Sequence, residues 1–200
     1  MLRRIEFWVI GGMVASLLVA AAVVFTRPHS FRGSVIDPPL PAPDFALEDG
    51  SGGRFRLSEQ RGKLVILFFG FTTCPDVCPT TLSEMKLIHK RLGTLAEDAR
   101  FVLITVDPER DTPERTAQYA ASFHPAFIGL SGSEEELQPV WKAYGVYREK
   151  RQTASASGYL VDHSAFVYII DRNGNWRETF SFGAPVDDMV EDVRYLLRER

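Results

Sequence analysis

Residues 64–79 read LVILFFGFTTCPDVCP, and this stretch decides how the chain folds. Leu64–Phe71 is an unbroken apolar run, which is typical of a strand that is covered on both faces of a sheet. Two cysteines then lead into Pro79–Leu92, where apolar residues recur at helical spacing. Proline suits the first turn of a helix, because an amide there has no intrahelical partner. The stretch therefore predicts a buried strand, a cysteine-bearing turn and a helix.

Outward from this stretch, strand and helix patterns alternate. Further strands are expected at Phe45–Leu47, Arg54–Leu57, Phe101–Val106, Phe127–Leu130, Ala165–Ile170 and Trp176–Phe182. Further helices are expected from Asp111 to about Phe123, from Ser133 to Tyr144 and from Pro185 to about Arg198. Turn residues predict hairpins between the first two and the last two of these strands. The series predicts an α/β domain with a thioredoxin-like mixed sheet flanked by helices. A doubly wound flavodoxin-like sheet is the alternative, and the late hairpin argues against it.

A different kind of segment precedes this domain. Residues 7–26 contain no charged residue and have the length that a helix needs to cross a bilayer. We therefore expect residues 1–6 to be a cytoplasmic N-terminus, 7–26 a transmembrane anchor, 27–44 a stiff proline-rich tether and 45–200 the domain. A cleaved signal peptide is the alternative. No organelle presequence precedes the apolar run, which favours a single-pass protein of the bacterial inner membrane with its C-terminal domain on the periplasmic or extracytoplasmic side.

The composition excludes several classes of protein. The chain has 200 residues, of which 45% are hydrophobic, so it is not a wholly disordered chain. The net charge is -3, and because residues 1–33 carry +3 the rest carries -6. An acidic body argues against nucleic acid as a partner. Two cysteines are too few for a disulfide-rich scaffold or a four-cysteine zinc site.

Cys74 and Cys78 lie where a strand gives way to a helix. Helix-terminal N–H groups stabilise thiolates at such a position, which lowers the pKa of the cysteine. Inert buried thiols or a static disulfide are the structural alternatives, although a disulfide here would close only a short loop. Ordinary thioredoxin-type enzymes use Cys-x-x-Cys, whereas this pair has a three-residue spacer that suits a shared metal as well as a disulfide. Two thiolates favour a soft metal such as Cu(I), and a third ligand is then needed.

One of the four histidines is a candidate for that third ligand. His29 lies in the expected tether, His89 on a wet helix face, and His124 at a helix end, where it would serve as a cap. His163 directly precedes an expected strand. In a thioredoxin-like fold this loop faces the cysteines, and the proline usual there is missing from the whole stretch 154–174. We therefore expect His163 to be a ligand.

Three motifs resemble the Sco/SenC family of copper-binding thioredoxin-like proteins: CPDVCP at 74–79, DPERDTP at 107–113 and DHS at 162–164. The resemblance implies that Cys74, Cys78 and His163 bind one copper ion, as Cu(I) or, with another donor, as Cu(II). It also implies a membrane-anchored metallochaperone that assists assembly of the CuA centre of cytochrome c oxidase subunit II. The partners would be that subunit, a copper donor protein and a thiol reductant.

Three acidic residues are candidates to support the site. Asp162 could orient or tune His163, or simply cap a loop. Asp107 and Asp111 could supply a fourth ligand or dock a partner, but Asp111 has capping-box spacing to Glu114 and is better explained as a helix cap. The same thiols also suit a thiol–disulfide oxidoreductase that reduces the partner's cysteines, or a peroxidase-like thiol enzyme. A plain binding module with a structural disulfide is the remaining alternative.

Overall fold

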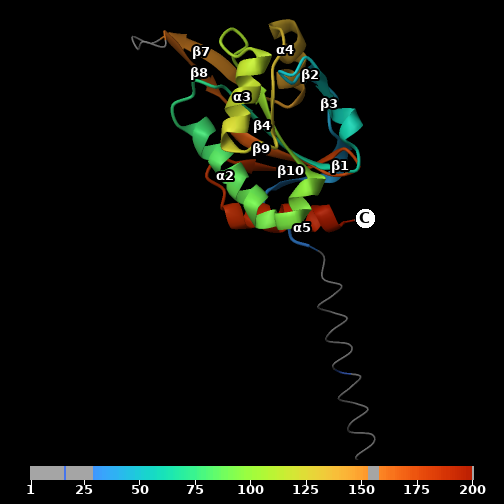
Figure 1. Cartoon of the computed structure of the whole chain (residues 1–200). Helices are drawn as coiled ribbons and strands as arrows, with labels where there is room; N and C mark the ends of the chain where they lie inside the picture. The colour runs from blue at the N-terminus through green and yellow to red at the C-terminus, as the bar shows by residue number, and fades with distance from the viewer. Residues whose placement is uncertain (1–15, 17–28, 153–157, 200) are drawn as a thin grey trace, which may run out of the picture. The chain divides into compact units, whose positions relative to one another are not determined.

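Six strands form the central sheet of the domain (Figure 1). The computed structural model describes Ser16 and residues 29–152 and 158–199. Across the sheet the strands are β1 (Ser34–Pro41), β10 (Asn175–Ser181), β9 (Phe166–Ile170), β4 (Leu64–Gly70), β5 (Ala99–Thr105) and β6 (Phe127–Leu130). β4, β5 and β6 are parallel, whereas β9, β10 and β1 join antiparallel. The predicted mixed sheet of thioredoxin-like type is confirmed.

Helices follow the strands where the apolar periodicity placed them. They are α2 (Val77–Leu92), α3 (Pro113–Phe123), α4 (Glu134–Ala143) and α5 (Val186–Arg198), with short 3-10 turns at Leu57–Gln60 and Gly93–Asp98. α2 contacts both α3 and α5 (Figure 1). α4 begins with the predicted capping box, in which Ser133 and Glu136 each bond the other's backbone N–H.

β4 forms the centre of the core. All seven of its residues are buried, as its unbroken apolar sequence predicts for a strand between two neighbours and two covered faces. Gly70 ends the strand where it passes under α2. A Cβ atom there would lie 2.9 Å from the Sγ of Cys78, so only glycine allows the helix to approach this closely.

Two hairpins lie outside the main sheet. β2 (Ala46–Glu48) and β3 (Arg54–Arg56) pair as the sequence predicts. The second hairpin, β7 (Arg148–Gln152) with β8 (Tyr159–His163), was not among the expected elements. Its first strand reads REKRQ and has no buried residue, so no apolar alternation marks it. His163 is therefore the last residue of a strand and not part of a simple loop.

Residues 34–41 of the predicted stiff, proline-rich tether (27–44) do not link two parts of the protein but form strand β1 of the domain. This strand pairs with β10, and the register shifts between Val35 and Leu40. The prolines are tolerated because β1 lies at the edge of the sheet, where outward backbone positions need no hydrogen-bond partner. The compact unit begins at Phe31. Residues 7–26, the expected anchor, lie almost wholly outside the described residues; within the described ones, no helix is both long and apolar enough to cross a membrane.

Candidate metal centre

The two cysteines lie on either side of the start of α2. Cys74 belongs to the loop after β4, and its backbone N–H donates to the carbonyl of Phe71. Cys78 lies in the first helical turn and is fully buried, whereas Cys74 is half-buried. The Sγ of Cys74 accepts a hydrogen bond from the backbone N–H of Cys78 at 3.4 Å. The sulfur thus takes the place of a capping side chain, since Asp76 at the N-cap makes no such bond.

β8 brings His163 close to the two cysteines, on the side of the site opposite the cysteine loop. Its Nδ1 lies 2.9 Å from the carbonyl oxygen of Ser164. A carbonyl oxygen only accepts, so Nδ1 carries the hydrogen and Nε2 presents its lone pair. Nε2 lies 3.6 Å from the Sγ of Cys78. The rings of Phe68 and Phe71 pack edge-on against the imidazole and limit its rotation.

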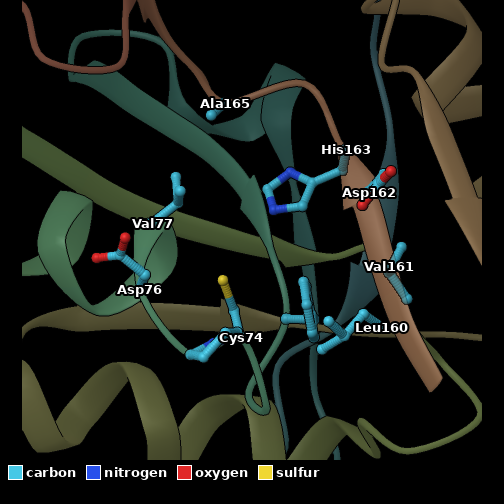
Figure 2. Close-up of a pocket in the computed structure, with 10 residues that line it drawn as sticks. Cys74, Asp76, Val77, Leu160, Val161, Asp162, His163 and Ala165 are labelled. Atoms are coloured by element: carbon cyan, nitrogen blue, oxygen red, sulfur yellow. The ribbon is translucent and has the colours of Figure 1, made fainter. Parts of the chain in front are cut away.

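A cleft of about 300 Å³ lies between the cysteine loop and β8. Figure 2 shows the sulfur of Cys74 and the imidazole of His163 turned toward each other across it. The donor atoms of Cys74, Cys78 and His163 all lie within 4.8 Å of one another, and they form the one such cluster of three or more metal-ligating side chains in the part of the chain that the structure describes. Two sulfurs and one imidazole nitrogen suit a soft, three-coordinate metal ion.

The two thiols differ in acidity. A hydrogen bond from the Cys78 thiol lowers the pKa of Cys74 to about 4, and burial of Cys74 opposes this shift. The same bond, together with burial and the charge of Cys74, raises the pKa of Cys78. The pair therefore holds one thiolate, on the half-exposed cysteine, and one proton, on the buried cysteine.

Asp111 is a buried support for the cysteine loop, and its expected function as a helix cap is wrong. Its carboxylate accepts from the backbone N–H of Thr72 at 2.9 Å, from the Thr72 hydroxyl at 2.6 Å and from the Thr105 hydroxyl at 2.8 Å. Burial raises the pKa of Asp111, and the threonine bonds oppose the rise. Thr112 caps α3 instead, by accepting from the N–H of Arg115.

Asp107 and Asp162 have partners outside the cluster. Asp107 is fully buried and accepts from Arg110 and from the hydroxyl of Tyr159. Asp162 forms an ion pair with Arg151, and its carboxylate lies on the side of β8 away from the imidazole (Figure 2). The Nδ1 bond of His163 goes to Ser164, so Asp162 does not orient the ring through it.

The other described histidines of the domain lie apart from the cluster. His89 and His124 pack against each other, with ring centroids 3.9 Å apart. His124 is the C-cap residue of α3, as expected. His89 is half-buried, not on a fully wet face, and its pKa is lowered by burial and by His124. Sequence reasoning missed Arg110 and Tyr159 beside the site, because nothing in their local pattern shows that they meet.

Comparison with known proteins agrees with this fold. Residues 36–198 match the family model described as SCO1/SenC. A SCO2-like protein of Rickettsia conorii is 39% identical over 152 residues, which are 76% of this chain and 74% of the relative. The solution structure of apo Sco1 from Thermus thermophilus superposes with a TM-score of 0.75 at 42% identity, covering 84% of this chain and 98% of that one. The copper-bound crystal structure of Arabidopsis thaliana ScoI gives a TM-score of 0.73 at 36% identity, covering 80% and 99%.

Fold and site together define a thioredoxin-like domain with a Cys-x-x-x-Cys pair and an opposing histidine. The family model spans more than half of the chain, and the similarity to the Rickettsia conorii relative covers 74% of that protein. The chain belongs to the SCO1/SenC family.

Proposed function

We propose that the domain is a copper metallochaperone that holds one copper ion through Cys74, Cys78 and His163. The observation that carries this proposal is the convergence of the three donor atoms within 4.8 Å. Solved relatives from Arabidopsis thaliana and Bradyrhizobium japonicum contain bound copper, which supports the choice of metal. Two thiolates favour Cu(I) over harder ions. We further propose that the copper serves the CuA centre of cytochrome c oxidase subunit II.

The difference between the two cysteines suits the transfer of a metal ion. Cys74 opens onto the cleft, so an incoming donor or acceptor sulfur reaches it first. Cys78 is buried against Gly70, so its sulfur is the last to exchange the metal ion. Binding releases the proton held by the pair, because both sulfurs coordinate as thiolates. His163 enters through Nε2, since its Nδ1–H is already bonded to Ser164.

The test is an anaerobic Cu(I) titration of the full, reduced chain against a competing chelator, with X-ray absorption to count ligands. Wild type is expected to bind one copper ion with two sulfurs and one nitrogen. His163→Ala removes a ligand and is expected to lose the nitrogen and at least the roughly 10- to 100-fold in affinity that loss of an outer-shell partner typically costs. His124→Ala is the matched control, because this histidine is also half-buried but lies outside the cluster. Unchanged nitrogen coordination and affinity in His163→Ala would refute the site.

A second candidate function is reduction of the partner's disulfide, and the low pKa of the half-exposed Cys74 favours it. The Cys74 thiolate attacks one partner sulfur, forms a mixed disulfide and releases the other sulfur as a thiolate. Cys78 then attacks Cys74, which releases the second partner thiol and leaves a Cys74–Cys78 disulfide. Two electrons thus pass to the partner, and a thiol reductant must restore the pair. Failure of the reduced, metal-free chain to reduce an oxidised peptide that carries the partner's cysteines excludes this function.

We also propose that residues 7–26 anchor the protein in the inner membrane of a bacterium, with the domain outside the cytoplasm. The absence of charge over a bilayer-spanning length supports this. Rickettsial relatives support a bacterial source. Extraction of the protein from membranes by alkaline carbonate contradicts the anchor.

A further inference from the structure

The hairpin that carries His163 is weakly connected to the hydrophobic core. β7 and β8 form a sheet of their own, and Figure 1 shows them at the margin of the domain, far from α5. Of the ten residues in the two strands, only Val161 is buried. Burial of apolar side chains therefore fixes the position of β8 far less than that of β4. Polar contacts have to hold it.

Three side chains supply such contacts at the start of β8. The guanidinium of Arg110 lies over the ring of Tyr159, 3.8 Å from its centroid, and donates to the Tyr159 carbonyl at 3.0 Å. The Tyr159 hydroxyl donates to Asp107 at 2.7 Å, and the Nε of Arg110 donates to the other oxygen of the same carboxylate. The ring, the hydroxyl and the backbone carbonyl of Tyr159 are thus each held by Arg110 or Asp107. We name Asp107, Arg110 and Tyr159 the Arg110 clamp.

The clamp acts on the same side of β8 as the imidazole. Residues two and four apart in a strand share a face, so Tyr159, Val161 and His163 all point the same way. At the other end, Arg148 lies opposite His163 in the hairpin register and donates to the carbonyl of Val106. The hairpin is therefore fastened at both ends, and loss of the clamp would free only the end that starts at Tyr159.

The segment 107–111 holds the cysteine loop as well. Asp111, at its other end, bonds the backbone and the hydroxyl of Thr72, two residues before Cys74. One five-residue segment thus binds both parts of the chain that supply donor atoms. Its own position is fixed because it follows the buried strand β5.

We infer that the Arg110 clamp positions His163 against the two cysteines, with Arg110 as a positioning residue that touches no metal. The inference rests on the proposed function where it is tested by copper binding. A measurement on the metal-free chain tests it from the structure alone. Without the clamp, the Tyr159 end of β8 moves independently of segment 107–111, and the strand that carries the imidazole is then held at its Arg148 end, so the distance from Nε2 to the sulfurs is set less closely. Both cysteines keep their places, because Asp111 still holds their loop.

The test compares Arg110→Ala with Arg177→Ala in the full chain. Arg177 is a matched control, because its side chain is similarly buried (13% exposed against 17%), pairs with a buried carboxylate and lies over an aromatic ring. Its partners are Asp171, Glu199 and Phe31, none of which belongs to the hairpin. A general loss of stability would therefore affect both variants, whereas release of the hairpin would affect only Arg110→Ala.

Two measurements decide the outcome. In the metal-free chain, amide hydrogen exchange in Tyr159–His163 is expected to rise at least about tenfold in Arg110→Ala and to stay at the wild-type rate in Arg177→Ala. With Cu(I), Arg110→Ala is expected to lose about 10- to 100-fold in affinity and to show weakened nitrogen coordination while both sulfurs remain. Tyr159→Phe keeps the ring under the guanidinium and loses only the hydroxyl bond, so it is expected to fall between wild type and Arg110→Ala.

Equal hairpin exchange in the two arginine variants would overturn the inference, and so would full nitrogen coordination in Arg110→Ala. Failure of the proposed function is a separate result, because wild type itself would then bind no copper through nitrogen. The exchange measurement needs no metal and still decides whether the clamp holds the hairpin.

Discussion

The cysteines and the histidine reach one cleft from two regions that are built differently. Cys78 lies in the first turn of α2 and packs against Gly70 of β4, a strand with every residue buried. His163 ends a two-stranded hairpin that has one buried residue. Hydrophobic burial therefore fixes the sulfur side of the site, whereas a few polar contacts fix the nitrogen side. A site divided in this way can keep its thiols in place while the histidine is brought in or released.

The largest expected difference between the two regions concerns apolar truncation. Phe68 is fully buried in β4, and its ring packs edge-on against the imidazole of His163. Phe68→Ala is expected to lower the free energy of unfolding by about 3 to 5 kcal/mol, because it leaves a cavity in a close-packed core. Leu160→Ala, in the half-buried part of β8, is expected to cost only about 1 kcal/mol. Denaturant unfolding of both variants measures this, and equal losses would show that the hairpin belongs to the core.

A second expected difference concerns Asp111, which is buried and supports the cysteine loop through hydrogen bonds and not through apolar packing. Asp111→Ala leaves the Thr72 amide and the Thr105 hydroxyl without their buried acceptor. We expect a loss of about 2 to 3 kcal/mol in the free energy of unfolding, together with faster alkylation of Cys74 as its loop loosens. Asp187→Ala is the control, since this aspartate is 84% exposed and pairs only with Arg91 among the described residues. Equal losses in the free energy of unfolding of the two variants would mean that the buried hydrogen bonds of Asp111 add no more stability than an exposed ion pair.

The same contrast explains what the sequence predicts and what it does not. The apolar run 64–71, the cysteines and the helix after them are local signals, and the structure contains all three. Asp111 also has a local signal, its spacing to Glu114, which predicts a helix cap. Its carboxylate instead accepts three hydrogen bonds from Thr72 and Thr105. Thr72 lies 39 residues away in sequence, and no local pattern records such a contact.

The histidine side was predicted from its place in the expected fold and not from any local pattern. REKRQ has neither apolar alternation nor a turn signal, so the sequence does not predict this hairpin. Arg110 and Tyr159 are separated by 49 residues, and only the fold brings them together. The prolines of β1 wrongly predict a tether instead of a strand, because the edge of a sheet tolerates proline. Local burial is readable from sequence, whereas polar contacts between distant residues are not.

The smallest expected effect separates the buried polar contacts of the hairpin from its exposed ones. Arg151 pairs with Asp162, the neighbour of His163, but the two side chains are 64% and 44% exposed. Water and salt screen such a pair, so Arg151→Ala is expected to change the free energy of unfolding by no more than about 0.5 kcal/mol. Hydrogen exchange in β8 is expected to stay at the wild-type rate, in contrast to Arg110→Ala. A large rise in exchange would mean that charge pairs at the surface also hold the histidine, and the distinction between its two kinds of contact would fail.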